Sequence, residues 1–297
     1  MAENNVLVVG AVHLDVLVEP DARRVSPTDN PRDKPGRVTY ALGGTAFNIS
    51  SGLKHMGVEP TLWSMLDTGL ISDAVVKAVE RTGIHAIIAR QETLMPAGFV
   101  AWVSDGDMQQ AVCSSPLENL NLPPSIAASL VAGRQMVVLD GNLSLDATLT
   151  FAAAARTQNI PVWWCATSDV KVKKARALAG QMDLIALNRY EVGRLLSAFD
   201  IAGSSYQELA HALEATLLVT RDEDGVALVT GEGMVVLPSL TDRDHSRIFL
   251  GAGDALLAGV LVSRLEGADW RKALEEGLEQ ASRVSTSVGC NSIGVYL

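Results

Sequence analysis

Short runs of aliphatic and β-branched residues alternate with segments of helical composition along this chain, and the alternation limits the folds open to it. Four of the runs lie at residues 6–10, 137–142, 161–165 and 183–187, and a helical segment spans residues 147–156. Runs this short and apolar are typical of strands buried on both faces of a parallel sheet. Strands that alternate with helices favour a sheet covered by helices on both sides. The sequence therefore predicts an α/β fold with a central, mostly parallel sheet.

A second set of segments has the pattern of half-exposed strands. Apolar and polar residues alternate at 12–19, which places Asp15 on the polar side, and similar segments lie near 36–41, 98–104 and 108–113. We expect these four segments to form a small antiparallel sheet apart from the main one.

The charge balance and the cysteines limit the partners and the location. A net charge of −10 argues against nucleic acid or an anionic membrane as the main partner. Cys113, Cys165 and Cys290 are odd in number and widely spaced, which favours neither a disulfide framework nor a zinc site. No uncharged apolar run reaches ~18 residues, and the N-terminus lacks the basic region of a signal peptide. We expect a cytoplasmic protein whose partners are small molecules.

Gly251, Ala252, Gly253 and Asp254 precede a long apolar run, residues 255–265, that has the composition of a buried helix. The first amides of a helix have no intrahelical partner and carry partial positive charge, so this turn can hold an anion such as a phosphoryl group. A carboxylate there would repel a phosphate, which suggests a base for an attacking hydroxyl. The alternative is that Asp254 is an ordinary helix cap.

Two further elements combine turn residues with polar side chains at helix starts. Gly43 and Gly44 allow close approach of backbone amides to a ligand, and Asn48 in the following helix can donate to and accept from hydroxyls, although the glycines are also explained by a simple turn. Asn188 and Glu191 follow the strand at 183–187 with the spacing of a capping pair. A carboxylate in that first turn also faces the crevice where α/β sheets bind ligands.

These motifs together resemble the ribokinase-like (PfkB) family of sugar and nucleoside kinases, in the family's order and over nearly the whole chain. The resemblance implies a single domain over residues 1–297, built as a three-layer sandwich with the small sheet as a lid over the substrate. It also implies ATP and Mg²⁺ as cofactors. The exposed edges of lid strands often pair between subunits, which suggests a homodimer through the lid.

The resemblance assigns roles to the matching residues. Asp254 would be the catalytic base, and Gly251, Ala252 and Gly253 would stabilise charge in the transition state. The substrate would lie beside Asp15, Gly43, Gly44 and Asn48, and ATP beside Asn188, Thr220, Gly225, Gly253 and Asn291. Glu191 would hold Mg²⁺ through water.

Three stretches depart from the family or carry no role in it. Asp222 replaces an inner glycine between Thr220 and Gly225, and the acids crowded there should weaken contact with a phosphate. Residues 248–250 replace an Asp-Thr-Thr stretch, which puts the family's monovalent-cation site in doubt. The basic run of Lys171, Lys173, Lys174 and Arg176 is best interpreted as a solvated helix face.

The function implied is ATP-dependent phosphorylation of a primary hydroxyl on a sugar or nucleoside. Residues 34–38 and 140–144 resemble pseudouridine kinases of this family, so pseudouridine is the preferred acceptor. Ribose, a ketohexose phosphate or another nucleoside are the competing acceptors, and a catalytically silent sensor is the alternative of another class. A nicotinamide-dependent dehydrogenase is disfavoured, because residues 10–13 do not continue as Gly-x-Gly-x-x-Gly.

Overall fold

The computed structural model describes residues 5–21, 35–92, 95–104, 107–201, 203, 205–240 and 251–286, which form two sheets. The larger sheet has nine strands in the order β13-β12-β11-β10-β9-β8-β1-β4-β5. Neighbours from β5 to β11 run parallel, and β12 and β13 are antiparallel. In chain order the strands are β1 (Asn5–Val9), β4 (Glu59–Asp67), β5 (His85–Gln91), β8 (Met136–Asp140), β9 (Val162–Cys165), β10 (Leu184–Asn188), β11 (Thr216–Thr220), β12 (Val226–Thr230) and β13 (Gly233–Leu237).

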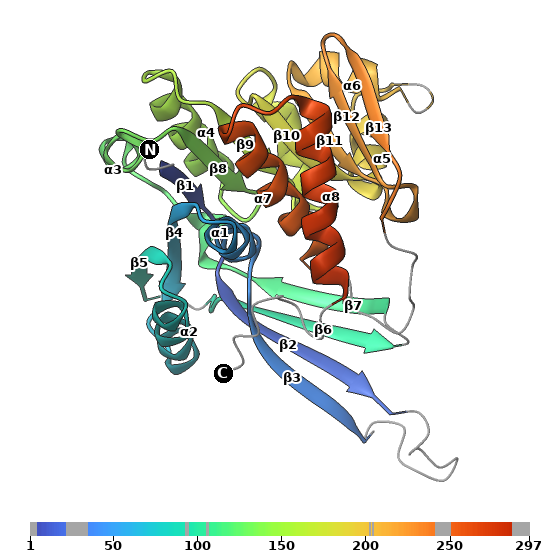
Figure 1. Cartoon of the computed structure of the whole chain (residues 1–297). Helices are drawn as coiled ribbons and strands as arrows, with labels where there is room; N and C mark the ends of the chain where they lie inside the picture. Colours follow the sequence, from blue (N-terminus) through green and yellow to red (C-terminus); the bar gives the residue numbers. More distant parts are fainter. Residues whose placement is uncertain are drawn as a thin grey trace.

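Helices cover both faces of this sheet (Figure 1). One layer is α1 (Thr45–His55), α2 (Leu70–Arg81), α7 (Ala252–Leu265) and α8 (Trp270–Thr286), and the other is α3 (Pro124–Val131), α4 (Leu145–Arg156), α5 (Arg189–Ala198) and α6 (Tyr206–Leu213). Successive side chains of a strand point to opposite faces, so Val6 and Val8 pack with the first layer, and Leu7 and Val9 with the second. The predicted three-layer α/β arrangement is confirmed.

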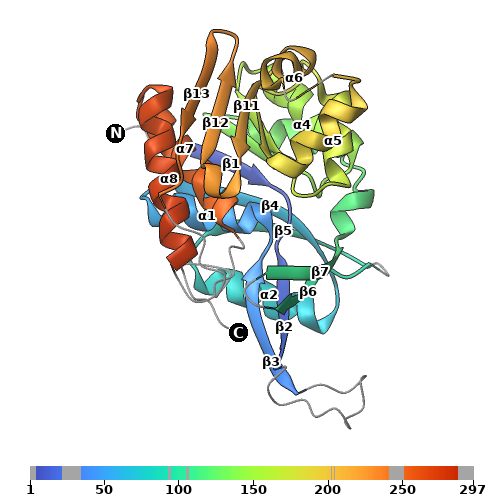
Figure 2. The same cartoon turned by 90° about the vertical axis from the view of Figure 1, so that its right-hand side faces the viewer.

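The smaller sheet has the order β3-β2-β6-β7 and extends away from the main sheet (Figure 2). Its strands are β2 (His13–Pro20), β3 (Gly36–Gly43), β6 (Gly98–Ser104) and β7 (Asp107–Ser114). The outer pairs are antiparallel, but the middle pair, β2 and β6, runs parallel, because the chain passes through the main sheet between them. That residues 1–297 form one domain stays a prediction.

Two of the helices cross at glycines. A Cβ atom added at Gly259 of α7 would lie 2.8 Å from the Cα of Gly277 in α8, and one added at Gly277 would lie 2.7 Å from a methyl carbon of Val260. The backbones therefore approach each other more closely than side chains allow. This contact holds α7, whose first turn carries Asp254.

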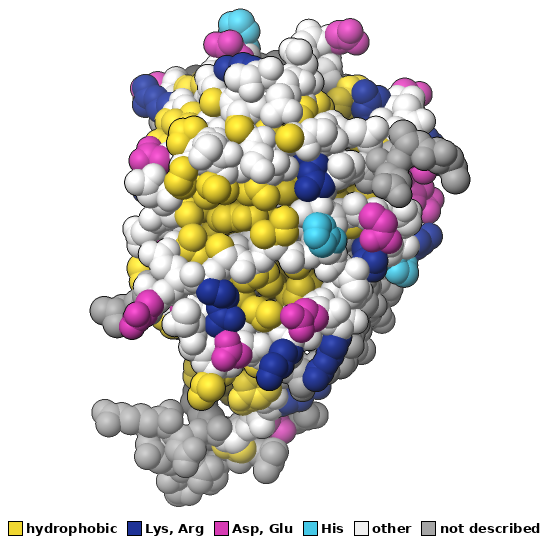
Figure 3. Space-filling model, turned by 90° about the vertical axis from the view of Figure 1, so that its left-hand side faces the viewer, with side chains coloured by type: hydrophobic (Ala, Val, Ile, Leu, Met, Phe, Trp, Pro, Cys, Tyr) yellow, Lys and Arg dark blue, Asp and Glu magenta, His cyan; other side chains and the backbone are white. Residues whose placement is uncertain are grey.

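The side of the molecule at edge strand β5 carries a surface of exposed hydrophobic side chains (Figure 3). Ile87 of β5 and Ile71 of α2 are among the exposed apolar residues.

No helix in the described part of the chain has the length and apolar character needed to cross a membrane.

We expect Gly277→Ala to destabilise the protein by about 1–3 kcal/mol, because the added methyl group overpacks the helix crossing. Gly193 of α5 is the matched control, since a Cβ there meets nothing within 4 Å. Gly193→Ala should be neutral or stabilising by up to about 1 kcal/mol, because alanine favours the helix. Urea unfolding of both variants measures the difference, and equal free energies of unfolding would contradict the packing role of Gly277.

Candidate active site

Asp254 lies in the first turn of α7 and is held by a residue from the other end of the chain. The helix begins after Gly251, whose φ of 86° suits glycine, so Gly251 and not Asp254 is the cap. Asn48 of α1 donates from Nδ2 to Oδ2 of Asp254 at 2.8 Å. The ordinary-cap alternative for Asp254 is therefore wrong, and the structure brings Asn48 and Asp254, which the sequence analysis treated separately, into contact.

Two buried acceptor atoms beside Asp254 lack hydrogen-bond donors. Oδ1 of Asn48 and Oδ1 of Asp15 are buried and have no hydrogen-bond partner among the described residues. Nδ1 of His13 lies 2.9 Å from Oδ1 of Asp15, but the pair is not aligned for a hydrogen bond. Buried acceptors without donors are costly, so their presence together indicates a site for a ligand that donates hydroxyl groups.

Gly43 and Gly44 serve the packing around this site. A Cβ at Gly43 would lie 2.1 Å from the carboxylate of Asp15, and one at Gly44 would lie 2.3 Å from the carbonyl oxygen of Ala11. The same carbonyl accepts a hydrogen bond from the amide of Phe47 at 3.2 Å. The two glycines thus let Asp15 and the start of α1 come together, and direct contact of either glycine with a ligand stays a prediction.

Four carboxyl groups lie close together near the carboxyl ends of the main-sheet strands: those of Asp15, Asp140, Glu191 and Asp254. Burial raises the pKa of Asp254 from 3.8 to about 7, against the lowering effect of the Asn48 hydrogen bond. The charges of Asp140, Asp15 and Glu191 raise it further. A carboxyl group with a pKa near 7 can accept a proton from an alcohol at neutral pH.

Asp140 is one of these four carboxyl groups, and the sequence motifs gave no catalytic or binding role for it. Its carboxylate, at the end of β8, accepts from the amide of Ala11 at 2.7 Å and from that of Asn142 at 2.8 Å. A side chain at Gly10 would come within 2.2 Å of it. Asp140 therefore joins the carboxyl ends of β1 and β8, and its position at the end of a buried strand was the available signal.

Asn188 and Glu191 form the predicted capping pair at the start of α5. Oδ1 of Asn188 accepts from the amide of Glu191 at 2.9 Å, and Oε2 of Glu191 accepts from the amide of Asn188 at 2.8 Å. Burial raises the pKa of Glu191 to about 7, and the charge of Asp169 adds to this. In the described ranges no group of three or more His, Cys, Asp and Glu side chains is placed to hold a metal ion. Mg²⁺ commonly takes only one or two carboxylates besides substrate phosphates, a role open to Glu191.

In the turn between β11 and β12, Asp222 takes up the backbone conformation of the glycine that the family pattern has at this position. Asp222 has a φ of 53°, the left-handed conformation that glycine adopts freely. Nε of Arg189 lies 3.0 Å from Oδ2 of Asp222, which balances one of the acids in this turn. Gly225 is required by packing, because a Cβ there would lie 2.1 Å from the carbonyl oxygen of Leu237. Thr220 ends β11 next to Asn188, its neighbour on β10.

Gly253 differs from these glycines. It is exposed in the first turn of α7, and a Cβ added there would meet nothing within 4 Å. Among the described residues, no packing contact therefore requires a glycine at position 253. Asn291 and residues 248–250 lie outside the described residues.

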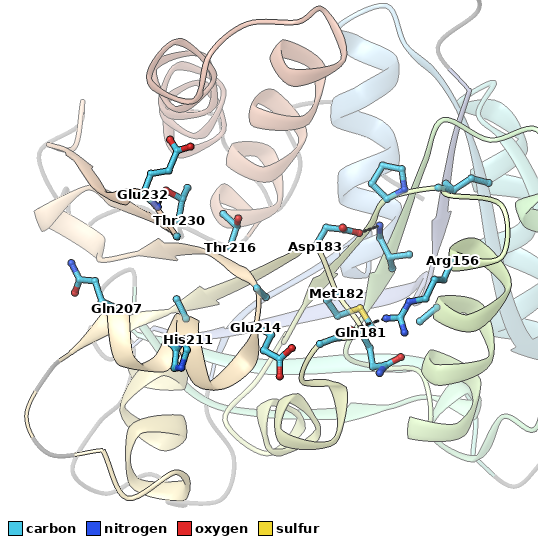
Figure 4. A pocket seen from close by; sticks show the side chains of 18 of the residues that line it. Arg156, Gln181, Met182, Asp183, Gln207, His211, Glu214, Thr216, Thr230 and Glu232 are labelled. Atoms are coloured by element: carbon cyan, nitrogen blue, oxygen red, sulfur yellow. Dashed lines mark hydrogen bonds between the residues drawn. The ribbon is translucent and has the colours of Figure 1, made fainter.

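A pocket of about 1020 Å³ lies at the amino-terminal ends of β9, β10 and β11, and Figure 4 shows the side chains that line it. Asp140 and Asn188 end their strands on the opposite side of the sheet. It is lined in part by Arg156, Asp183 and His211. Arg156 donates to the carbonyl of Gly180 at 2.7 Å, and Asp183 accepts from the amide of Val162 at 2.7 Å. Asp183 thus holds the start of β9 and Arg156 holds the segment before β10, and the residues of this pocket belong to no part of the site above.

The basic run at residues 171–176 differs from what the sequence predicts. Lys171 and Lys174 lie in the 3₁₀ helix η3 (Lys171–Leu178) and turn inward, whereas Lys173 and Arg176 are exposed. Nζ of Lys174 donates to the carbonyl oxygens of Gly141 at 2.7 Å and of Leu143. The interpretation as a solvated helix face is wrong for these two lysines, because Lys174 donates to backbone carbonyls of the turn after β8 and Lys171 is held by the side chains of Asn142 and Glu118.

We expect the ligand-free protein to lose stability as the pH rises through about 7. Because the folded pKa of Asp254 is raised from 3.8 to about 7, the folded state holds its proton more tightly than the unfolded state, and that stabilisation disappears when the proton is lost. The melting temperature of Asp254→Asn should therefore fall less between pH 5 and pH 8, taken as round values about the pKa shift. Asp146→Asn, an exposed carboxylate on α4, is the control and should follow the wild type. Parallel curves for all three proteins would contradict the burial of Asp254.

The sequence and the fold of this chain both match those of known kinases. A sequence model of the pfkB family carbohydrate kinases matches residues 3–294. A pseudouridine kinase of Arabidopsis thaliana is 24% identical over 238 residues, which cover 75% of this chain and 61% of that protein. A D-beta-D-heptose 7-phosphate kinase of Bordetella bronchiseptica is 26% identical over 304 residues, which cover 92% of this chain and 88% of that protein. This chain thus spans less than two thirds of the length of the Arabidopsis relative.

Among solved structures, Arabidopsis thaliana ribokinase complexed with ribose and ATP matches with a TM-score of 0.76 at 17% identity, over 98% of this chain and 97% of that one. This likeness confirms the ribokinase-like fold expected from the sequence. Because the family model matches nearly the whole sequence, the chain belongs to the pfkB family of carbohydrate kinases.

Proposed function

We propose that this protein transfers the terminal phosphoryl group of ATP to a primary hydroxyl of a small hydroxylated acceptor. The observation that supports this best is the set of acceptor atoms around Asp254. Oδ1 of Asp15 and Oδ1 of Asn48 are buried without donors, and Asn48 also binds the carboxylate of Asp254. Substrate hydroxyls are the donors that this arrangement fits.

The proposed chemistry follows from the first turn of α7. Asp254 takes the proton of the acceptor hydroxyl, whose oxygen attacks the terminal phosphorus of ATP while the bond to ADP breaks. The amides of the first turn, with Gly251, Ala252 and Gly253, face the negative charge that develops on the phosphoryl oxygens. Most of the acceleration comes from positioning and electrostatics.

The nucleotide is proposed to lie along the ends of β10 and β11. By the family pattern, Asn188, Thr220, Gly225 and Gly253 line this path. The pattern also assigns Asn291 to ATP, and that residue lies outside the described ranges. Mg²⁺ would neutralise charge on the ATP phosphates, and Glu191 is the residue that would hold it through water. The ion pair of Arg189 with Asp222 reduces the repulsion expected from the acidic turn.

Pseudouridine is the proposed acceptor. The Arabidopsis pseudouridine kinase is one of the relatives, and residues 140–144 carry the local resemblance. A sugar kinase is the runner-up, because the Bordetella relative is a heptose 7-phosphate kinase. A silent sensor is the alternative of another class, and the presence of Asp254, Asn188 and Glu191 at their expected positions disfavours it.

We expect Asp254→Asn to lower turnover at least about a hundredfold, because the variant cannot accept the hydroxyl proton. ADP release from wild type and variant, measured with pseudouridine, uridine, ribose and fructose 6-phosphate, checks both the role and the acceptor. Folding is checked near pH 5, where Asp254 of the wild type is protonated. At this pH the melting temperature of Asp254→Asn should stay close to that of the wild type. Near-normal turnover by the variant would refute the role, and a wild type that binds but never consumes ATP would favour the sensor.

A homodimer through the small sheet is also proposed. The strand register places Val100, Val112 and Tyr40 in one row on the outer face and Val38 and Trp102 in the next. All five are exposed in the single chain. A second copy of this sheet would cover such an apolar face.

Trp102→Glu should convert the dimer to a monomer, because a carboxylate on the outer face would be buried without a partner. Sedimentation velocity at micromolar concentration measures the change. Ile126→Glu is the control, since Ile126 is equally exposed but lies on α3. A monomeric wild type, or a Trp102→Glu dimer, would exclude this interface.

A further inference from the structure

The inner face of the small sheet carries a row of three residues that faces the site. The register pairs Asp15 of β2 with Phe99 of β6, and Phe99 with Cys113 of β7. Residues paired in this way point to the same face. The ring of Phe99 is also stacked with that of His13, with centroids 6.1 Å apart. An aromatic ring thus lies between Asp15, which is next to the catalytic centre, and Cys113.

The Cys113 end of the row meets a buried lysine. Nζ of Lys171 lies 3.2 Å from Oε1 of Glu118 and 3.7 Å from Sγ of Cys113, and it donates to Oδ1 of Asn142. The side chain of Lys171 is only 13% exposed. An ammonium group has three donors, and the thiol is the weakest of the three acceptors here. We call Lys171, Asn142 and Cys113 the distal wall.

Asp140 is a neighbour of both the distal wall and Asp254. Asp140 accepts from the amide of Asn142 and is also a charged neighbour of Asp254. Cys113 is exposed as a residue, but partial desolvation of its thiol raises the thiol pKa, and the charges of Glu118 and Asp140 add to this. Asp140 is therefore near both the distal wall and Asp254.

A further polar group beside the distal wall has no partner. Thr167 follows β9 with a φ of 69°, a conformation that β-branched residues rarely adopt. A Cβ at Gly141 would lie 2.9 Å from its Oγ1, so the hydroxyl lies against the turn that carries Asn142. This oxygen is buried and has no hydrogen-bond partner in the described part of the chain. Strained residues with unpaired polar groups are found at ligand sites.

The charges at the distal wall decide which ligand group fits. Glu118 balances Lys171, and the ammonium group of Lys174 is turned to the carbonyls of the Asn142 turn. Asp140 adds a negative charge nearby. A phosphate group would meet no net positive charge here, whereas a neutral carbonyl oxygen needs only one donor. A flat ring would also pack on Phe99.

We infer that the distal wall binds a ring carbonyl of a nucleobase through Lys171 and so selects nucleosides over sugars and sugar phosphates. The inference rests on the proposed kinase function and names the part of the acceptor remote from the phosphorylated hydroxyl. Lys171 acts here in substrate specificity and takes no part in proton transfer.

Lys171→Met should raise the KM for pseudouridine by about tenfold to a hundredfold, because a charge-assisted hydrogen bond is lost, with a smaller change in kcat. The KM for ribose should stay within about twofold, since ribose has no base to lose that contact. Lys173→Met, on the exposed side of the same helix, is the matched control and should match the wild type. An unchanged KM for pseudouridine, or equal rises for both acceptors, would overturn the inference.

A binding measurement keeps the test independent of catalysis and of how well Lys171→Met folds. The wild type is alkylated with N-ethylmaleimide, and the modified cysteines are identified by peptide mapping. Cys113 is exposed and Cys165 buried, so pseudouridine should slow the modification of Cys113, while ribose and fructose 6-phosphate should not. Equal protection by all three, or none by pseudouridine, would also overturn the inference. If the wild type phosphorylates no acceptor at all, the proposed function fails, and pseudouridine protection of Cys113 still reports on the distal wall.

Discussion

The hydrogen bond from Asn48 to Asp254 joins two helix starts that lie 206 residues apart in the chain. It orients the carboxylate of α7 toward α1, and the close crossing of α7 and α8 at Gly259 and Gly277 holds the helix that carries it. A partly buried carboxylate is unfavourable unless it is hydrogen-bonded, so this contact makes the position of Asp254 tolerable. The remainder of the site is arranged around it.

Four acidic side chains lie close together near the carboxyl ends of the main-sheet strands, and packing alone does not explain why like charges gather there. Asp15, Asp140, Glu191 and Asp254 are near enough that the charges of the other three raise the pKa of Asp254, although burial is the larger cause. Packing alone would favour apolar residues at these places. The first amides of α7 carry partial positive charge and lie beside Asp254, which fits the proposed pairing of an anion site with a proton acceptor. Such perturbed carboxyl groups are typical of sites that transfer protons.

The parts of the site that the sequence predicted are those with local patterns. The glycine turn before a buried helix, the glycine pair before Asn48 and the three-residue spacing of Asn188 and Glu191 all depend on neighbours in the chain. Lys171 was misassigned because its partners, Glu118 and Asn142, are 53 and 29 residues away, and spacing on one helix cannot show them. Asp140 was missed for the same reason, since it binds the amide of Ala11, which lies 129 residues away in the segment between β1 and β2. The parallel pairing of β2 with β6 also depends on long-range topology.

The glycines separate what packing requires from what a ligand requires. At Gly10, Gly43 and Gly225 a side chain would collide with atoms of the protein itself, so these residues are needed whether or not anything binds. At Gly253 the described structure leaves open space, and the residue lies in a helix, where glycine costs about 1 kcal/mol relative to alanine. Nothing in the described fold offsets that cost. The proposed approach of a phosphoryl group to the first turn of α7, which also carries Asp254, is a reason for a glycine at this position.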